Sequence, residues 1–366
     1  MGHVSSINFG FQEPAINSPL RPVFVGLSPG GLLPVRMATL FTAAILSTLA
    51  SNVADAGPKK SADTVATAKT DIDARRQVMN DVKSWAIQLR YIDREKLSAT
   101  PIDLVVIDHA PHPKQDVEKP FLPEEIAPLK GQPDGKRRLV VAYLSIGEAE
   151  RYRYYWNPAW DVAETRPAWL GSENPRWPGD YQVKFSDPDW QSIIFGTPQS
   201  YLERIVASGF DGVYLDRVDA YQDVEATVPG AEDAMAGFVT RLADHARRLN
   251  PRFLVIMQNA EELVRRKSLV SRLDAIAKED LAFGGANTEE PNPPQMVRDT
   301  VQYLRRAKHA GLKIFMLEYV GDAKKAASAR ALASREGFII HFTERLLGTL
   351  TTDAPDRPAA VLPKSE

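Results

Sequence analysis

From residue 84 onward, short runs rich in β-branched and aromatic residues alternate with amphipathic segments. This alternation is typical of a parallel sheet built from βα units, because each parallel strand needs a crossover connection, usually a helix. The candidate strands are Trp85–Tyr91, Asp103–Asp108, Leu139–Ser145, Tyr181–Phe185, Gly212–Asp216, Phe253–Gln258, Leu273–Ala277 and Lys313–Tyr319. Eight such strands predict an α/β protein with a closed (β/α)8 barrel, the TIM barrel.

Two further features concern the number of strands and the helices between them. A ninth apolar run, Phe338–Phe342, exceeds the expected count, so either it is an added strand or the weak run Tyr181–Phe185 lies outside the barrel. Segment Ala231–Leu249 carries apolar residues at helical spacing, and Pro294–Ala310 begins with prolines, which a helix start tolerates. We expect a helix over each of these two segments.

The C-terminal ends of the candidate strands are strongly polar, and in a parallel barrel the active site forms at these ends. The residues found there are Asp108, His109, Glu148, Asp216, Asp219, Gln258, Asn259, Glu279, Asp280, Glu318 and Tyr319. A single acid in such a place is commonly a helix N-cap. Carboxylates at five strand ends repel one another and contribute nothing to stability, so the pattern favours a functional acidic pocket.

Aromatic residues gather in one loop-rich region. Five of the six tryptophans, Trp156, Trp160, Trp169, Trp177 and Trp190, fall between residues 156 and 190. Aromatic rings above a barrel mouth can stack on sugar rings while carboxylates bind hydroxyl and amino groups. The alternative is a local aromatic core that fixes a long loop, and the sequence leaves both open for each tryptophan.

Two carboxylates facing each other across a pocket are the groups that glycoside hydrolysis requires. One protonates the leaving oxygen, while the other attacks the anomeric carbon or activates water. The strand-end acids offer several such pairs, and the pattern alone does not choose among them. A different reading takes His109, His112 and Asp108 as ligands of a catalytic metal, although Pro111 makes helical presentation of the two histidines unfavourable.

The composition excludes several other functions. Lys and Arg number 45 against 47 Asp and Glu, a net charge of −2, whereas nucleic-acid-binding proteins are usually basic. The chain has no Cys, and therefore no disulfide framework, Cys-ligated zinc or thiol nucleophile. Neither the phosphate-binding G-x-x-x-x-G-K-[ST] loop nor the dinucleotide-binding G-x-G-x-x-G motif is present.

The N-terminal region has the features of an export signal. Arg36 precedes the apolar stretch 38–50, which is too short to span a bilayer but has the length of a signal-peptide core. The small residues Ala54 and Ala56 fit a cleavage site that would leave Gly57 first. A buried N-terminal helix is the alternative, and Met37 is an alternative start. The sequence thus predicts a secreted or periplasmic protein with no stable membrane insertion after cleavage.

Four regions are expected along the chain. Residues 1–56 form an N-terminal extension with the signal peptide, and residues 57–83, rich in Ala, Thr, Lys and Asp, form a flexible linker. The barrel occupies residues 84–350, and residues 351–366 form a disordered tail.

Several segments match, in order, a known pattern: Ser84–Leu89, Ile102–Asp108, Ala142–Glu150, Glu173–Pro175, Trp177–Gly179, Gly209–Asp216, Gln258–Asn259, Glu279–Leu281 and Glu318–Tyr319. Together they resemble the barrel of glycoside hydrolase family 114, the endo-α-1,4-polygalactosaminidase group, over roughly residues 84–350. Members of this family often carry a label relating them to cysteinyl-tRNA synthetase, but this chain has no synthetase nucleotide-binding signature.

The resemblance implies an enzyme that cleaves α-1,4-linked galactosamine-containing polysaccharide with two carboxylates and without cofactor or metal. Asp216 and Glu279 are the implied catalytic pair, one as nucleophile or base and the other as acid. The implied substrate-binding residues are Asp108, Tyr143, Glu148, Asp219, Gln258, Asn259, Glu318 and Tyr319. An acidic mouth would also attract a de-N-acetylated amino sugar, which is a cation near neutral pH.

Two alternatives use the same scaffold. The first is a barrel that binds polysaccharide without cleaving it, and the second is a metal-dependent polysaccharide deacetylase. The sequence leaves open the oligomeric state, endo or exo action, retention or inversion at the anomeric carbon, and which carboxylate is the acid.

Overall fold

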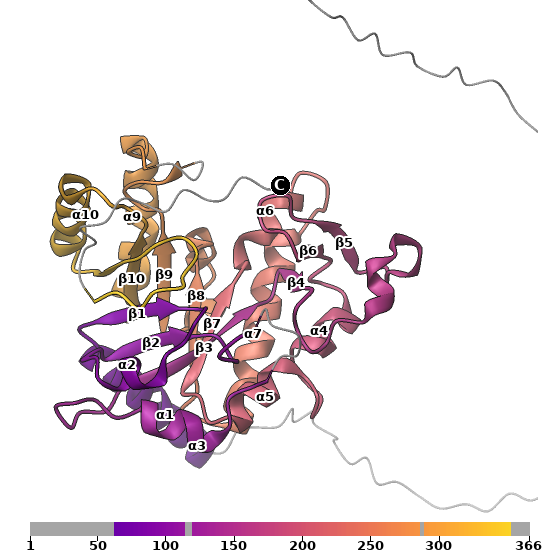
Figure 1. The fold of residues 1–366 in the computed structure, drawn as a ribbon, viewed down its shortest axis with the longest axis horizontal. Coiled ribbons are helices and arrows are strands. Elements are labelled where there is room, and N and C mark those ends of the chain that lie inside the picture. Colours follow the sequence, from indigo (N-terminus) through magenta and orange to yellow (C-terminus); the bar gives the residue numbers. More distant parts are fainter. Residues whose placement is uncertain (1–61, 114–118, 286–288, 353–366) are drawn as a thin grey trace, which may run out of the picture. The chain divides into compact units, whose positions relative to one another are not determined.

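The computed structural model describes residues 62–113, 119–285 and 289–352. Within these ranges, eight parallel strands form one sheet surrounded by helices (Figure 1). Their order is β1 (Trp85–Gln88), β2 (Leu104–Ile107), β3 (Leu139–Ser145), β7 (Gly212–Asp216), β8 (Leu254–Gln258), β9 (Ala275–Glu279), β10 (Lys313–Glu318) and β11 (Ile339–Phe342). Each strand lies beside the next one along the chain, which confirms the predicted (β/α)8 architecture.

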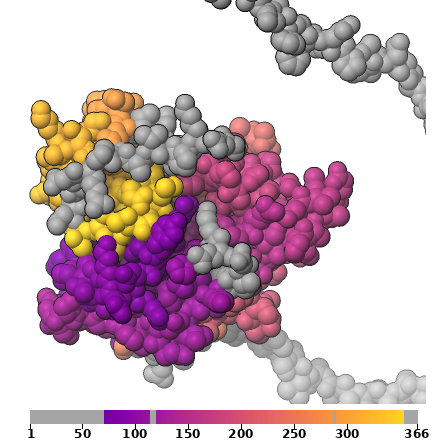
Figure 2. All heavy atoms as spheres, in the orientation of Figure 1, coloured from indigo at the N-terminus to yellow at the C-terminus, as the bar shows by residue number. Residues whose placement is uncertain are grey.

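The first and last strands of the sheet meet at a seam. The indole Nε1 of Trp85 donates to the carbonyl of Ile339 at 2.9 Å, and its ring centroid lies 5.7 Å from that of His341. Beyond the strands, the Leu89 amide donates to the Leu347 carbonyl at 2.8 Å. Figure 2 shows the residues near the C-terminal end of the described chain, in yellow, against the indigo residues of the first βα unit. The sheet is therefore nearly closed into a barrel.

The interior of the barrel is filled by large apolar side chains. Trp85, Leu104 and Leu139 lie in register on three adjacent strands and share one buried cluster with the inward-facing residues of the other strands. Met79 and Val82, at the end of α1 (Ala62–Asp81) and just after it, belong to the same cluster. The end of α1 thus closes the N-terminal side of the barrel and leaves the opposite side for a site.

The remaining helices are α2 (Arg94–Ser98), α3 (Pro123–Leu129), α4 (Pro188–Ile194), α5 (Tyr201–Ala207), α6 (Tyr221–Val224), α7 (Ala231–Leu249), α8 (Lys267–Val270), α9 (Pro294–His309) and α10 (Ala323–Glu336). Short 3₁₀ turns are η1 (Pro158–Asp161), η2 (Ala163–Thr165), η3 (Val218–Ala220) and η4 (Glu261–Arg265). Helix α7 has the predicted bounds and buries Met235, Phe238 and Leu242, because residues three and four apart share one helix face. Helix α9 ends one residue earlier than predicted.

The weak run Tyr181–Phe185 is not a barrel strand. Asp180–Val183 forms β6, which pairs antiparallel with β4 (Glu148–Glu150) and β5 (Leu170–Glu173) in a separate three-stranded sheet. A strand of a parallel barrel is buried on both faces, whereas only Tyr181 of β6 is buried. The ninth run supplies the last barrel strand, β11, so the second of the two alternatives is correct.

The predicted flexible linker differs from the structure over residues 62–81, which form α1. Arg75 is buried, pairs with Asp274 at 3.1 Å and donates to the carbonyl of Pro251 at 2.8 Å. Met79, one turn later, is also buried. The segment has few large apolar residues, but Ala, Lys and Arg favour a helix, and two buried positions on one face are enough to dock it.

The ends of the chain complete the comparison with the predicted regions. The predicted signal peptide, residues 57–61 and most of the predicted tail lie outside the described residues. At the C-terminal side, the Thr351 hydroxyl donates to the carbonyl of Phe342 at 2.5 Å. In the described ranges no helix combines the length and the apolar character needed to cross a bilayer.

Candidate active site

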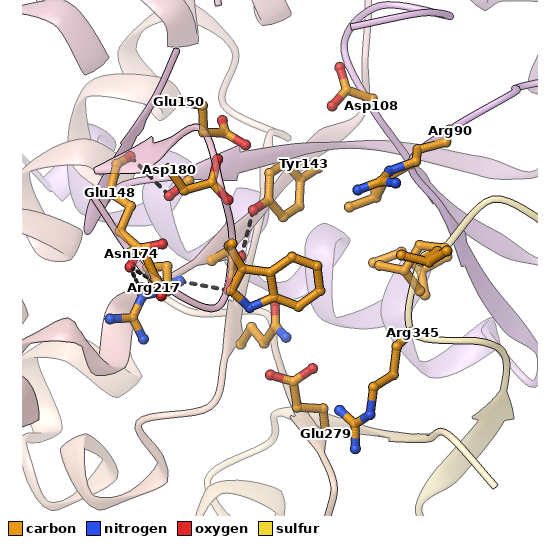
Figure 3. Close-up of a pocket in the computed structure, with 18 of the residues that line it drawn as sticks. Arg90, Asp108, Tyr143, Glu148, Glu150, Asn174, Asp180, Arg217, Glu279 and Arg345 are labelled. Carbon is orange, nitrogen blue, oxygen red and sulfur yellow. Dashed lines mark hydrogen bonds and ion pairs between the residues drawn. The ribbon is translucent and has the colours of Figure 1, made fainter. Parts of the chain in front are cut away.

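A pocket of about 250 Å³ lies at the C-terminal ends of the barrel strands (Figure 3). Most of its lining comes from the segments that follow β1, β2, β3, β7, β8, β9 and β10 and from the three-stranded sheet. Seven carboxyl groups and four arginines of the described residues line it, so its charge is predominantly negative. Its acidic side chains are Asp108, Glu148, Glu150, Asp180, Asp216, Asp219 and Glu279.

The backbone turns sharply where three strands enter this pocket. Arg217, Asn259 and Asp280 have φ values of 55°, 55° and 51°, and each directly follows the last residue of its strand. Left-handed backbone is uncommon for residues other than glycine, and its cost is of order 1–3 kcal/mol per residue. The three turns hold Asp216, Gln258 and Glu279 at the mouth of the barrel instead of continuing the strands.

Asp216 ends β7 and is held by two donors. The Tyr143 hydroxyl donates to its Oδ2 at 2.5 Å, and the Arg217 amide donates to its Oδ1 at 2.7 Å. Desolvation in the pocket, followed by the negative charge of Glu279, raises the pKa of Asp216 to about 7, although the Tyr143 bond acts in the opposite direction. Near neutral pH this carboxyl group is therefore partly protonated and partly ionised.

Glu279 ends β9 and is also held at both oxygens. The amide Nδ2 of Asn259 donates to its Oε1 at 2.8 Å, and the Tyr319 hydroxyl donates to its Oε2 at 2.8 Å. Each of the two predicted catalytic acids thus receives a tyrosine hydroxyl from an adjacent strand. Because the charge of Glu279 acts on the pKa of Asp216, the two carboxyl groups form one electrostatically coupled pair.

A buried ion network lies on another wall. The Arg153 guanidinium is fully buried and donates to both oxygens of Asp108 at 2.8 Å. It also donates to Glu150 at 2.7 Å, and the Tyr152 hydroxyl donates to the same Glu150 carboxylate. Both oxygens of Asp108 therefore accept hydrogen bonds within the protein, and these bonds fix this wall of the pocket.

The β3–β4 connection carries a second network. Asn174 donates to Glu148 at 2.9 Å, and the Arg217 guanidinium pairs with Glu148 at 3.1 Å and with Asp219 at 3.2 Å. A Cβ atom at Gly147 would lie 2.1 Å from the Arg217 carbonyl, so only glycine fits where this connection meets the turn after Asp216. Burial raises the pKa of Glu148, and it does the same for Asp219.

The structure brings together both predicted catalytic acids and seven of the eight predicted substrate-binding residues in this pocket: Asp108, Tyr143, Glu148, Asp219, Gln258, Asn259 and Tyr319. Glu318 is the exception, because it is fully buried and does not belong to the pocket lining. It accepts the amides of Ala282 at 2.7 Å and Phe283 at 3.3 Å, and burial raises its pKa to about 8. Glu318 therefore supports the loop after β9 and, unlike the other predicted substrate-binding residues, lies outside the pocket lining.

Sequence reasoning did not select several residues of the lining. Arg90, Glu150, Arg217 and Arg345 all line the pocket, and Arg345 binds both oxygens of Asp280 at 2.9 Å. Arg217 directly follows a predicted catalytic acid, and Glu150 is the last residue of the matched segment 142–150. The sequence therefore contained an indication that both residues lie near the site. Arg345 lies beyond the last strand, where no sequence pattern indicates that the chain returns to the mouth.

Most of the tryptophans form a local core. Ring centroids of Trp156 and Trp160 lie 5.4 Å apart, those of Trp160 and Trp169 5.1 Å, and those of Trp169 and Trp190 5.2 Å. Of the five tryptophans, Trp177 alone lines the pocket in the described structure. The local-core interpretation therefore holds for four of them, and Trp177 remains a candidate for contact with a sugar ring.

The two histidines considered as metal ligands have different environments. The ring of His109 is buried and lies 5.3 Å from the ring of Tyr201 and 6.3 Å from that of Phe210, whereas His112 is exposed. Among the described residues no group of three or more His, Cys, Asp or Glu side chains has an arrangement that could hold a metal ion. His109 thus contributes to the core outside the pocket lining.

Comparison with known sequences adds to this geometry. Residues 64–355 match the model of glycoside hydrolase family GH114. An uncharacterised protein of Deinococcus radiodurans is 35% identical over 304 residues, which cover 82% of this chain and 92% of that protein. An uncharacterised protein of Methanocaldococcus jannaschii is 34% identical over 252 residues, which cover 66% of this chain and 67% of that protein.

Comparison with solved structures gives the same fold. The glycoside hydrolase domain of PelA from Pseudomonas aeruginosa superposes with a TM-score of 0.54 at 20% identity, covering 75% of this chain and 99% of that domain. Ega3 of Aspergillus fumigatus, solved in complex with galactosamine, gives a TM-score of 0.54 at 20% identity and covers 74% of this chain and 96% of that one. With the family match extending over the whole barrel, the chain belongs to glycoside hydrolase family GH114.

Proposed function

We propose that this glycoside hydrolase cleaves α-1,4-linked galactosamine-containing polysaccharide and that Asp216 and Glu279 are its catalytic residues. The observation that carries the proposal is the coupled pair of carboxyl groups, each bonded to a tyrosine hydroxyl, at the mouth of the barrel. Glycoside hydrolysis needs one carboxyl group that carries a proton and one that is ionised. A pKa of about 7 for Asp216, raised by burial and by Glu279, allows Asp216 to carry a proton near neutral pH.

The acidic lining supports the choice of substrate. A polymer with free amino groups is positively charged near neutral pH, and a pocket lined by seven carboxyl groups and four arginines in the described structure attracts it. The neighbouring structure of Ega3 contains galactosamine, which supports the same sugar class. Trp177 offers an apolar ring at the same pocket for stacking on a sugar face.

Product analysis tests the proposal. The purified protein is incubated with partly deacetylated α-1,4-galactosamine oligomers, and the products are followed by mass spectrometry. We expect shortened oligomers with the wild type and a loss of at least about a thousandfold in kcat with Asp216→Asn or Glu279→Gln, while oligomer binding persists. Glu124→Gln is the matched control, because Glu124 is exposed and lies outside the pocket lining.

The outcomes separate the alternatives. Binding without any product would contradict the hydrolase and support a barrel that only binds polysaccharide. Release of acetate without chain shortening, abolished by a chelator, would support a deacetylase. Full turnover by both variants would contradict the assignment of the catalytic pair.

Export is part of the proposal and is supported by the sequence of residues 36–56. The full chain is expressed in a bacterial host, and the N-terminal sequence of the protein recovered outside the cytoplasm is determined. We expect Gly57 as the first residue. Recovery of the intact chain from the cytoplasm alone would contradict export.

A further inference from the structure

The turn that follows β1 is held in place at the rim of the pocket. The Gln88 amide Nε2 donates to the carbonyls of Arg90 and Tyr91, each at 3.0 Å, and to the carbonyl of Gly348 at 3.2 Å. Tyr91 has a φ of 53°, which is uncommon for a large side chain. One buried amide thus joins the first βα loop to the segment after β11 and fixes the backbone from which the Arg90 and Tyr91 side chains extend.

Arg90 places a positive charge inside the pocket. Its side chain is half-buried and lines the cavity. Figure 3 shows Arg90 and Arg345 on one side of the view, with Glu148, Glu150 and Asp180 on the other. The charge of Arg345 is balanced by Asp280. The guanidinium of Arg90, by contrast, makes no hydrogen bond or ion pair with the protein in the part of the chain that the structure describes.

Tyr91 follows Arg90 in the chain and carries an exposed aromatic ring. The residue is 70% exposed, the largest exposed fraction among the large apolar and aromatic residues described. A Cβ atom built on Gly348 would lie 3.3 Å from Cδ2 of Tyr91, so the ring rests against a position that has no side chain. An exposed ring held by a strained backbone gains little for folding, but it offers a flat apolar face next to two residues of the pocket lining, Arg90 before it in the chain and Leu347 before Gly348.

We propose that Arg90 and Tyr91 form a distal subsite that binds a sugar unit without a positive charge. This inference rests on the proposed function, because it assigns a further subsite to the same polysaccharide. The Tyr91 ring stacks on the sugar, and the Arg90 guanidinium donates to a hydroxyl or amide carbonyl oxygen. A protonated amine at that place is repelled by Arg90, whereas the same amine is attracted to the carboxyl groups at the centre of the pocket.

The subsite predicts a substrate with mixed substitution along the chain. Amino sugars occupy the acidic centre, and a unit with an acylated amine or with hydroxyl groups alone occupies the position of Arg90. The enzyme should therefore prefer partly N-acetylated oligomers to fully deacetylated ones of the same length.

The experiment measures kcat/KM for the two kinds of oligomer, matched in length, with the wild type, Arg90→Gln and Tyr91→Ala. We expect Arg90→Gln to lower the preference for partly acetylated oligomers about fivefold or more, since it removes a repulsion from the fully deacetylated form. Tyr91→Ala should raise KM for long oligomers about two- to tenfold with kcat unchanged, and should leave trimers unaffected. Arg252→Gln and Leu249→Ala serve as controls, because both positions lie at the other end of the barrel.

Binding to the Asp216→Asn protein, with and without Arg90→Gln, distinguishes failure of the subsite from failure of the proposed hydrolysis. Turnover by the wild type with an unchanged preference in Arg90→Gln would overturn the subsite and leave the hydrolase standing. A changed binding preference without turnover in the wild type would retain the subsite and contradict hydrolysis. No binding of either oligomer would overturn the subsite as well.

Discussion

Tyr143 donates its hydroxyl to Oδ2 of Asp216 at 2.5 Å across the pairing of β3 with β7. The bond stabilises the ionised form of Asp216 and therefore opposes burial and Glu279, which both raise its pKa. The Tyr319 hydroxyl bonds Glu279 in the same manner across β10 and β9, at 2.8 Å. The balance between burial, the charge of Glu279 and the Tyr143 hydrogen bond sets the pKa of Asp216.

Replacing Tyr143 by Phe should raise the pKa of Asp216 further, because the ionised carboxylate loses a donor while burial remains. A hydrogen bond to a charged group contributes about 1.5–3 kcal/mol, so we expect an upward shift of about 1–2 pH units in the pH profile of kcat/KM. Tyr319→Phe is the matched comparison, because it removes the corresponding hydroxyl group that donates to Glu279. A drop in activity with an unmoved profile would show that Tyr143 acts only on the substrate.

Asp216→Asn should stabilise the protein above neutral pH. The folded pKa of about 7 lies above the value of 3.8 for an ordinary Asp. Its favourable contribution is therefore complete below about pH 4 and is lost as the pH rises through about 7. Asn does not titrate, so the variant should gain about 1–3 kcal/mol over the wild type at pH 8 and much less at pH 5. Thermal unfolding at both pH values measures this, and a constant Tm difference would contradict it.

Glu318 should matter for stability more than for chemistry. Glu318→Gln keeps one acceptor oxygen, for the Ala282 amide, but turns an NH2 group toward the Phe283 amide, so we expect a moderate loss of stability with kcat/KM within a few fold of the wild type. Glu318→Ala leaves these amides unsatisfied and should destabilise the protein by about 2–4 kcal/mol. Urea unfolding and kinetics of both variants provide the measurement. Loss of substrate affinity in a stably folded Glu318→Gln protein would instead place Glu318 in a subsite.

Arg153 should be among the residues most sensitive to replacement, because it neutralises both Asp108 and Glu150 in a buried position. Arg153→Met leaves two buried carboxylates without a cation and should destabilise the fold by about 3–5 kcal/mol. Arg153→Lys keeps the charge but cannot bind Asp108 through two parallel bonds, so an intermediate loss is expected. Denaturant midpoints would rank the two variants, and equal stability of Arg153→Met and the wild type would contradict the role of this network.

Treatment with a chelator should leave activity unchanged, because two carboxyl groups supply both the acid and the nucleophile or base. The assay compares kcat before and after extensive dialysis against EDTA and after addition of zinc. Loss of turnover on dialysis that zinc restores would contradict a mechanism built on Asp216 and Glu279 alone.

The barrel and the acids at its strand ends could be predicted from the sequence because they depend on local order, whereas the choice of Asp216 and Glu279 among those acids came from the resemblance to the family. Strands such as Gly212–Asp216 are short, apolar and followed by acids, and parallel strands place all their C-terminal ends on one side. Asp216 and Glu279 lie at two such ends, and the resemblance to the family selects them among the strand-end acids. The sequence predicts a linker over residues 57–83, whereas residues 62–81 form a helix, because the few apolar positions of this segment gain burial only when the helix meets the completed barrel.

Tertiary structure alone decided which polar side chains face the pocket. Glu318 and Tyr319 are neighbours in sequence where β10 ends, yet Tyr319 reaches Glu279 while Glu318 accepts backbone amides of the loop after β9. Successive side chains of a strand point to opposite faces, and a one-residue difference therefore separates a pocket residue from a structural one. Arg345 returns to the mouth of the barrel, and Gln88 holds the turn that carries Arg90. Both features depend on contacts between segments more than 250 residues apart in the chain, such as the bond from Gln88 to Gly348. The sequence by itself determined the strands and the acids at their ends, whereas the closure of the barrel determined which of those acids meet and which cations oppose them.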